Sequence, residues 1–254
     1  MTAKSSSHLQ EMRRRPLGGL SLIAARPEQA SRAVIEASKA GGGGRAVHFL
    51  NAYSLALAQS DGEFRSTLQT EAHNFPDGKP LSWVTRWSAE PLHQVRGPQF
   101  FLDVMNKGRA SDVRHFLLGG SQDLLDKLER NLTDLFPGVL LVGSFSPPFR
   151  QLAAEEILAQ DALIRESEAD IVWVGLGTPK QDFEVQRLAA ELHVVACAVG
   201  AAFDFTAKTK REAPRWMTSV GLEWLYRLLS EPRRLWKRYL IGNFVFLRAI
   251  LRDH

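Results

Sequence analysis

Short apolar runs alternate with longer segments of helical periodicity through most of the chain. Runs typical of buried strands occupy residues 45–50, 114–118, 139–143, 170–175 and 193–199. Between them, apolar positions at helical spacing predict helices over 52–60, 98–107, 121–135, 150–167 and 180–192. Strands and helices that alternate at this pitch are typical of a parallel sheet covered by helices on both faces. The pattern therefore predicts an α/β fold.

Glycine-bearing turns follow several of these predicted strands. They contain Gly119, Gly120, Gly143, Gly175, Gly177 and Gly200. Ligands of open α/β sheets bind beyond the carboxyl ends of the strands, so we expect these turns to converge on one site.

The most informative turn lies in DIVWVGLGTPKQD, residues 170–182. There Gly175 and Gly177 let the backbone approach a ligand, and the helix that begins near Lys180 presents free N–H groups to an anion. An ordinary strand-to-helix turn would explain the glycines alone, but Lys180 and Gln181 favour the ligand site.

The pattern changes near residue 205. Ala213-Pro214 and Ser230-Glu231-Pro232 resemble helix starts. Apolar side chains then recur at a spacing of four, which predicts one helical stripe formed by Trp216, Val220, Trp224 and Leu228. In the next segment, Trp236 and Tyr239 alternate with basic residues. This end either lies in a membrane surface or packs on the body with a solvated basic face, and the two are compatible.

Charge divides the chain in the same place. Residues 205–254 carry 11 Lys and Arg against 4 Asp and Glu, whereas the rest carries 21 against 24. A basic end on a mildly acidic body favours phosphate-bearing partners: nucleic acid, anionic lipid or a phosphorylated substrate. The single cysteine, Cys197, excludes an internal disulfide framework, and no apolar stretch is long enough to cross a membrane as a helix. The amino terminus is basic without an apolar core, which predicts a loose tail rather than a secretory signal.

Candidate chemistry in the first third centres on three residues. Asp77 stands in Pro-Asp-Gly, Asn51 follows a predicted strand, and Arg96 precedes an aromatic helix start. Each has an ordinary alternative: a turn for Asp77, a helix cap for Asn51 and a surface arginine for Arg96. The chain has no Asp-x-Asp pair, no HExxH and no GxxxxGK[ST] loop. We therefore expect no metal and no cofactor, with cations and helix N-termini binding any diphosphate.

These pieces together resemble the WecG/TagA/CpsF family, glycosyltransferase family 26. The resemblance covers roughly residues 45–245 and rests on FLNAYSL, FPDGKPLSWV, RGPQFFLDV, FLLGGSQDLLDKLERNL, FPGVLLVGSFSPPF, DIVWVGLGTPKQD, VGAAFDF and APRWMTSVGLEWLYRLLSEPRRLWKRY. It implies inverting, metal-independent transfer of a hexose or N-acetylhexosamine from a UDP-sugar to a polyprenyl-diphosphate-linked acceptor, such as an undecaprenyl diphosphate sugar. It also implies a peripheral place on the cytoplasmic face of the bacterial inner membrane. SPPF and GAAFDF are closer to exopolysaccharide-type members.

The resemblance also implies roles for residues of this chain. Asp77 corresponds to the proposed general base, Asn51 to a polar position after the first strand, and Arg96 to an arginine near the leaving diphosphate. The nucleotide-cradling positions correspond to Gly119, Gly143, Gly175, Gly177, Pro179, Gln181 and, near the nucleotide, Asp204. The acceptor and membrane positions correspond to Arg227, Arg233, Arg234 and Arg238.

The chain departs from the family pattern in places. Phe49 stands where many members have threonine, and Ala201-Ala202 replaces a glycine and a threonine. Glu212 replaces a basic or polar residue and would repel a diphosphate unless it points away. A catalytically inactive member that scaffolds polysaccharide assembly therefore stays open as an alternative.

Pattern and resemblance together predict a Rossmann-like parallel central sheet flanked by helices, with a basic helical C-terminal appendage. We expect a flexible tail over 1–20, a nucleotide-sugar-binding catalytic domain over 21–204 and the appendage over 205–254. The expected partners are the UDP-sugar, the lipid-linked acceptor, an anionic membrane surface and a second copy of the chain. Nucleic-acid binding by the basic tail is a rival that leaves PDG and GLGTPKQ unexplained. A nucleotide-dependent oxidoreductase is disfavoured because GLGTP is not GxGxxG.

Overall fold

The computed structural model describes residues 8–41, 43–233, 235, 236, 242, 246 and 248. The strands are β1 (Arg14–Leu17), β2 (Leu20–Ile23), β3 (Arg45–Leu50), β4 (Ala72–Pro76), β5 (Arg114–Leu118), β6 (Leu140–Phe145), β7 (Ile171–Val174) and β8 (Val195–Ala198). The α-helices are α1 (His8–Glu11), α2 (Pro27–Lys39), α3 (Ala52–Ser60), α4 (Gly62–Gln69), α5 (Lys79–Thr85), α6 (Gly97–Gly108), α7 (Gln122–Leu135), α8 (Ala154–Glu166), α9 (Lys180–Leu192), α10 (Ala202–Thr206), α11 (Arg215–Ser219) and α12 (Glu223–Ser230).

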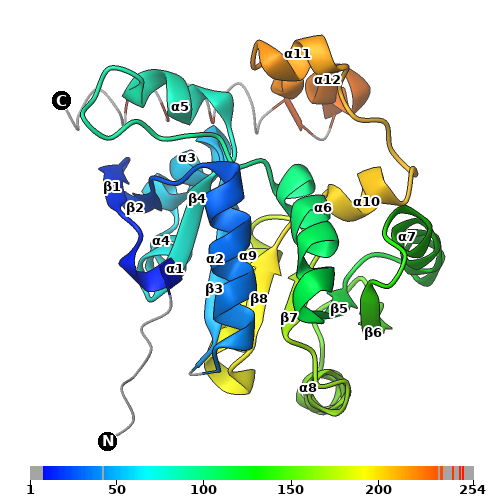
Figure 1. Cartoon of the computed structure of the whole chain (residues 1–254). Coiled ribbons are helices and arrows are strands. Elements are labelled where there is room, and N and C mark those ends of the chain that lie inside the picture. The colour runs from blue at the N-terminus through cyan, green and yellow to red at the C-terminus, as the bar shows by residue number, and fades with distance from the viewer. Residues whose placement is uncertain are drawn as a thin grey trace, which may run out of the picture.

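The strands form one eight-stranded sheet within the described part of the chain. Their order is β1-β2-β4-β3-β8-β7-β5-β6, and β1 alone runs antiparallel to its neighbour. Helices cover both faces (Figure 1). The predicted α/β, Rossmann-like fold with a parallel central sheet is therefore confirmed.

Alternate residues of the central strands pack on opposite faces, as the two-residue period of a strand requires. Trp173 of β7 and Cys197 of β8 belong to the core beneath α2, α6 and α7. Their neighbours Val172 and Ala196 belong to a second core beneath α9. Because both faces are buried, these strands are continuously apolar, and for this reason the sequence pattern found them.

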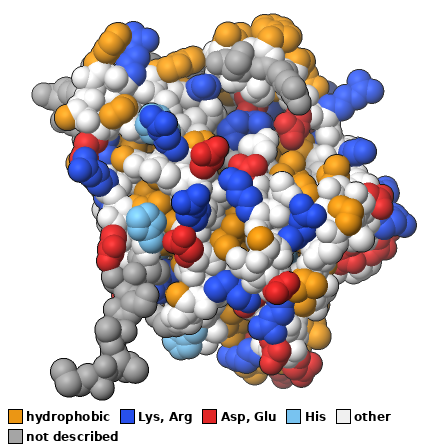
Figure 2. Space-filling view, viewed as in Figure 1, with side chains coloured by type: hydrophobic (Ala, Val, Ile, Leu, Met, Phe, Trp, Pro, Cys, Tyr) orange, Lys and Arg blue, Asp and Glu red, His pale blue; other side chains and the backbone are white. Residues whose placement is uncertain are grey.

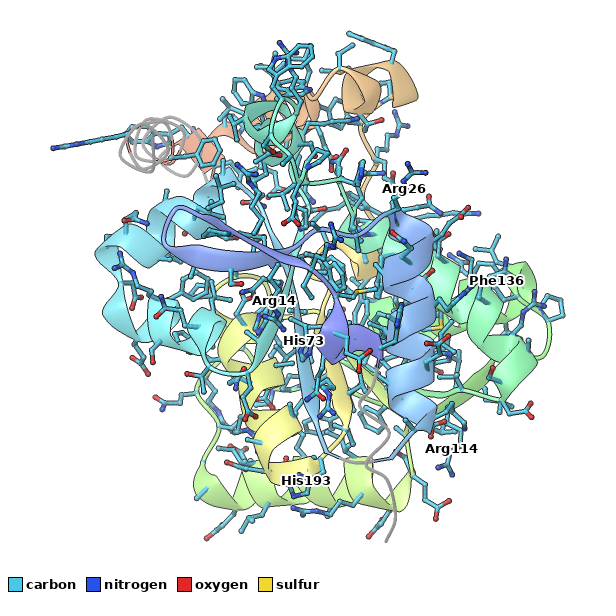
Figure 3. The ribbon with its side chains drawn as sticks, turned by 60° about the vertical axis from the view of Figure 1, so that its left-hand side comes forward. Arg14, Arg26, His73, Arg114, Phe136 and His193 are labelled. Carbon is cyan, nitrogen blue, oxygen red and sulfur yellow. The ribbon has the colours of Figure 1, made fainter. Side chains whose placement is uncertain are left out.

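The amino-terminal segment differs from the loose tail predicted over 1–20. Residues 14–17 form β1, and Leu9 and Leu17 are buried. The guanidinium of Arg14 donates a hydrogen bond to the carbonyl oxygen of Ala72 in β4, 2.9 Å away. Figure 3 shows Arg14 of β1 next to His73, which follows Ala72 in β4. The sequence pattern did not predict this strand, because two of its four residues are arginines. It is held by backbone pairing with β2 and by the buried side chain of Leu17.

The predicted stripe from Trp216 to Leu228 is also corrected. Two short helices, α11 and α12, replace the single helix, and Gly221 lies between them with φ +71°. A right-handed helix cannot continue through that conformation. Trp216 and Val220 are consequently exposed. Arg234, Arg238 and Tyr239 lie outside the described residues.

The helices α5, α11 and α12 lie above the carboxyl edge of the parallel strands (Figure 1). Figure 2 shows the side of the molecule seen in Figure 1, where basic and acidic side chains are interspersed over the middle and hydrophobic side chains lie near the upper edge. Among the described residues, none of the helices is both long enough and apolar enough to span a bilayer.

Candidate active site

A cleft of about 1490 Å³ opens at the carboxyl edge of the sheet. Its walls include the residues that directly follow four parallel strands: Asn51 after β3, Asp77 after β4, Gly175 after β7 and Val199 after β8. Gly177 and Gln181 line the same cleft. The predicted carboxylate and the GLGTPKQ turn are thus brought to one site.

Asp77 is held in place through its backbone and its carboxylate. Its N–H donates to the carbonyl oxygen of Leu50 at 2.8 Å, and its carbonyl oxygen accepts from the side chain of Gln94 at 2.6 Å. Its Oδ1 accepts a hydrogen bond from the N–H of Gly97, the first residue of α6, at 3.0 Å. Pro-Asp-Gly is therefore more than a surface turn, because the aspartate joins the ends of β3 and β4 to a helix N-terminus.

The surroundings of Asp77 make its carboxyl group basic. Burial and, next, the negative charge of Glu223 raise its pKa to about 6 from a usual value near 4. The Gly97 N–H, Arg96 and Arg227 oppose this change. The carboxylate is therefore ionised at neutral pH and still accepts a proton readily, which is what a general base requires.

Arg96 is engaged by two carboxylates of the C-terminal segment. Its Nε donates to Glu223 Oε2 at 3.2 Å, and its Nη2 lies 3.6 Å from Glu212 Oε2. Arg96 lines neither this cleft nor the second cavity described below, whereas Glu223 lines both. Glu212, which stands where the family pattern has a basic or polar residue, thus faces the guanidinium of Arg96.

Asn51 acts as the N-cap of α3. Its Oδ1 accepts hydrogen bonds from the backbone N–H groups of Tyr53, at 3.0 Å, and Ser54, at 3.3 Å. The cap satisfies two N–H groups that a helix start leaves without partners. The helix-cap interpretation is therefore confirmed; Asn51 also lines the cleft, and its contact with a ligand stays a prediction.

Gln181 braces the turn between β7 and α9. Its Oε1 accepts from the Gly177 N–H at 2.9 Å, and its Nε2 donates to the carbonyl oxygen of Ala198 at 3.3 Å. The side chain is almost fully buried. The Gly177 N–H is thereby used within the protein, so this turn shapes the cleft wall and its amide is not directed at an anion.

The remaining predicted glycines serve close packing. A Cβ on Gly175 would lie 2.6 Å from the ring of Phe203, and one on Gly119 would lie 2.9 Å from the Gly175 backbone. Gly143 is not in a turn but inside β6, where a Cβ would lie 2.7 Å from the Phe116 ring. Its predicted place in a nucleotide-cradling turn is wrong for this reason. Pro179 precedes α9 as its N-cap residue.

The rim near the C-terminal segment is rich in charge. Asp204 of α10 lines the cleft and forms an ion pair with Lys210 at 3.4 Å. Arg227 of α12 also lines the cleft, and its guanidinium lies 5.2 Å from the ring centre of Phe205. Arg233 is exposed and does not line the cleft. Cationic residues of the described lining are Arg150, Lys180, Arg187, Lys210, Arg211 and Arg227.

A second cavity of about 340 Å³ adjoins the first. The two share Asn51, Asp77, Glu223 and Arg227, so the Asp77 carboxyl group lies in a wall common to both. Its further lining residues are Ala52, Tyr53, Gly78, Lys79, Pro80, Trp83, Val84, Gln94, Thr218, Gly221, Trp224 and Phe246.

Sequence reasoning missed Glu223 and the aromatic residues of the second cavity. Glu223 and Trp224 are part of GLEWLYRLLSEPRR, but in this basic segment only arginines were predicted as site residues, and not the two glutamates, Glu223 and Glu231. Trp83 follows the PDG turn by only a few positions, in FPDGKPLSWV, and no motif marks it as a site residue. The proximity of Glu223 to Asp77 depends on how α12 sits over the sheet, which no local pattern encodes.

Within the described part of the chain, no three or more His, Cys, Asp or Glu side chains are grouped so that they could hold a metal ion. A model of the glycosyl transferase WecG/TagA/CpsF family matches residues 15–254. The match spans nearly the whole chain and includes every residue of the cleft and of the second cavity. The protein therefore belongs to the WecG/TagA/CpsF family and is a glycosyltransferase of cell-surface polysaccharide biosynthesis, a class that uses a nucleotide-sugar donor and a lipid-linked acceptor.

Proposed function

We propose that the protein is an inverting, metal-independent glycosyltransferase. It moves a hexose or N-acetylhexosamine from a UDP-sugar to a polyprenyl-diphosphate-linked sugar, for exopolysaccharide synthesis at the cytoplasmic face of the inner membrane. The observation that carries this proposal is the position of Asp77. Its carboxylate, with a pKa raised to about 6, lies in the wall of a large cleft that also presents cationic side chains.

In the proposed reaction, Asp77 acts as the general base. Its carboxylate takes the proton of an acceptor hydroxyl while that oxygen attacks the anomeric carbon of the donor from the face opposite the UDP. The new C–O bond forms as the bond to the diphosphate breaks, and UDP leaves with the electron pair. The hydrogen bond from Gly97 orients the carboxylate and leaves its second oxygen for the incoming proton.

Cationic side chains offset the charge of the diphosphate in this proposal. Among the described residues, no carboxylate lies within ion-pair distance of Lys180 or Arg211, and both line the cleft. Arg227 also lines the cleft, and it is close enough to Asp77 to lower the pKa of that carboxyl group. Fixed charges of this kind stabilise a leaving diphosphate where a water-poor site strengthens their effect. Arg96 acts indirectly, because it holds Glu223 beside Asp77.

A peripheral membrane position is supported by exposed apolar side chains above the carboxyl edge of the sheet. They are Trp87, Trp216, Val220, Leu229 and Trp236. Tryptophan is favoured where an apolar and an aqueous phase meet. The helices α5, α11 and α12, near which these residues lie, are on the same side of the molecule (Figure 1). This arrangement would bring the active site next to a lipid-linked substrate.

The test is the substitution Asp77→Asn, which keeps the shape of the side chain and removes its basicity. We expect UDP binding and the melting temperature to change little, and sugar transfer to a polyprenyl-diphosphate acceptor to fall by about 10²–10⁴-fold. Asp103→Asn, on the outer part of α6, is the matched control and should transfer normally. Undiminished transfer by Asp77→Asn would remove the carboxylate from the reaction, and a wild-type protein that binds no UDP would contradict the proposed donor.

A further inference from the structure

The second cavity meets the large cleft at Asp77 but differs from it in chemistry. Its lining is mostly apolar and comes from α3, α5, the turn at Gly221 and α12, not from the turns after β7 and β8. The cleft has more than four times its volume. A nucleotide-sugar fits the larger, charged space, which leaves the smaller one for a different ligand on the other side of the same carboxylate.

Aromatic side chains dominate the apolar part of this lining. Trp83, Trp224, Tyr53 and Phe246 all contribute to it. Trp83 is 47 % exposed, although an indole of this size is normally well buried. Pyranose rings present flat faces of C–H groups that stack on such rings, and water leaves both surfaces when they meet.

The position of Trp83 depends on the absence of a side chain at residue 221. A Cβ on Gly221 would lie 2.5 Å from Cη2 of Trp83 and 3.0 Å from Cβ of Lys79. The turn between α11 and α12 can therefore lie directly against α5. This contact joins the C-terminal segment to the body of the enzyme and forms one wall of the cavity.

Two cations accompany the aromatic residues. Lys79 and Arg227 both line the cavity, and Arg227 also reaches the cleft. The lining also holds the carboxylates of Asp77 and Glu223, and Glu223 pairs with Arg96 at 3.2 Å. Aromatic rings beside the cations Lys79 and Arg227 are complementary to a sugar that carries a diphosphate.

We propose that the second cavity is the acceptor site, which binds the sugar ring of the lipid-linked diphosphate acceptor on Trp83 and Trp224. Lys79 and Arg227 bind the acceptor diphosphate, and a ring hydroxyl faces Asp77. This inference rests on the proposed function. It adds the place where the acceptor binds and the residues that determine which acceptor is accepted.

The test uses a farnesyl-diphosphate-linked sugar that the wild-type protein accepts, in solution without membranes. We expect Trp83→Ala and Trp224→Ala to raise the acceptor KM by about tenfold or more, which corresponds to about 1.4 kcal/mol of lost binding. The Kd for UDP should stay within about twofold of wild type, since these side chains line only the second cavity. Val84→Trp, which fills the cavity from an exposed position, should have the same effect without removing a contact.

Leu135→Ala is the control. Leu135 is the last residue of α7, is 55 % exposed and lines neither cavity, so its replacement should leave the acceptor KM unchanged. If the wild type transfers sugar and all three cavity variants keep its acceptor KM, the acceptor site lies elsewhere while the proposed function stands. If the wild type transfers no sugar from any UDP-sugar, the proposed function itself fails. An equal rise of KM in Leu135→Ala would also overturn the assignment.

Discussion

At the scale of single residues, burial raises the pKa of Asp77 most, and the charges of Glu223 and Arg96 adjust it further. Glu223 raises the pKa of Asp77 through its negative charge, and Arg96 lowers it through its positive charge. The two form an ion pair with each other at 3.2 Å, so each limits the influence of the other. The pKa of Asp77, the proposed base, thus depends on an element far away in the chain, because Glu223 is the first residue of α12.

This arrangement predicts the pH dependence of transfer. Since the pKa of Asp77 is about 6, the rate should fall about tenfold per pH unit below that value, as the carboxylate becomes protonated. Glu223→Gln removes the charge that raises this pKa, so the acid limb should move to lower pH. The measurement is kcat/KM between about pH 4.5 and 8, which covers about 1.5 units on the acid side of that pKa.

Glu212→Gln serves as the control for that experiment, because Glu212 contacts Arg96 but is not among the groups that raise the pKa of Asp77. An acid limb that is identical in wild type and Glu223→Gln would show that another group controls the profile.

At the scale of elements, the ends of β5 and β7 come together through Gly119. Its φ is +119°, and a Cβ there would lie 2.9 Å from the Gly175 backbone. Gly177, in the next turn, also has a positive φ (+76°), but nothing lies within 4 Å of its Cβ position. An alanine at Gly119 meets both a steric clash and an unfavourable φ, whereas an alanine at Gly177 meets only the unfavourable φ. Comparing the two variants therefore isolates the cost of the clash.

We expect Gly119→Ala to lower the free energy of unfolding by about 2–6 kcal/mol, because backbone strain and a steric clash each cost about 1–3 kcal/mol. Gly177→Ala should cost only about 1–2 kcal/mol, the cost of the left-handed conformation. Urea unfolding of both variants, followed by circular dichroism, measures the difference. Equal losses would mean that β5 and β7 can separate at no cost.

The strands that the sequence predicted are those whose residues are mostly apolar. The apolar runs at 45–50 and 114–118 correspond to β3 and β5 with the same bounds. The strand β4 was missed because its buried residues include His73 and Asn74, which look like loop residues in a sequence. Asn74 is buried because its amide donates to the carbonyl oxygens of Ser21 and Leu68. Only the neighbouring elements supply those partners.

The candidate site, like the fold, was predictable only in part. Asp77 and the turn from Gly175 to Gln181 could be predicted from motifs, and the structure brings them to one cleft. The partners of Arg96 could not, because Glu212 and Glu223 reach it only through the path of the chain after β8. The second cavity depends on packing between α5 and the turn at Gly221, which follows from three-dimensional placement alone.

At the scale of the whole molecule, buried histidines link stability to pH. Burial, with smaller contributions from Arg14 and Arg45, lowers the pKa of His73 to about 4, and burial lowers that of His115 to about 4. Unfolded histidine titrates near 6.5, so the unfolded chain binds more protons between pH 6.5 and 4. The stability that these histidines provide is complete above pH 6.5 and is lost as the pH falls through that range.

For each of the two histidines, the free energy of unfolding should therefore fall by about 1.4 kcal/mol for each pH unit that the pH is lowered across this range. Urea unfolding at several pH values between 7.5 and 4.5, with His73→Phe as the variant, should show a shallower slope for the variant than for wild type. His193, exposed at the end of α9, supplies the control His193→Asn, since asparagine tolerates its left-handed conformation (Figure 3). Parallel slopes in wild type and His73→Phe would contradict the assignment.

The shared wall at Asp77 has a consequence for engineering. The two chambers are built from different parts of the chain, with strand ends forming one and α5 and the α11–α12 turn forming much of the other. A designer who wants this enzyme to modify another lipid-linked acceptor could randomise a few positions around Trp83 and Gly221, in the proposed acceptor cavity, and leave the proposed nucleotide cleft untouched. Libraries restricted in this way would sample new acceptors while the chemical step keeps the same carboxylate.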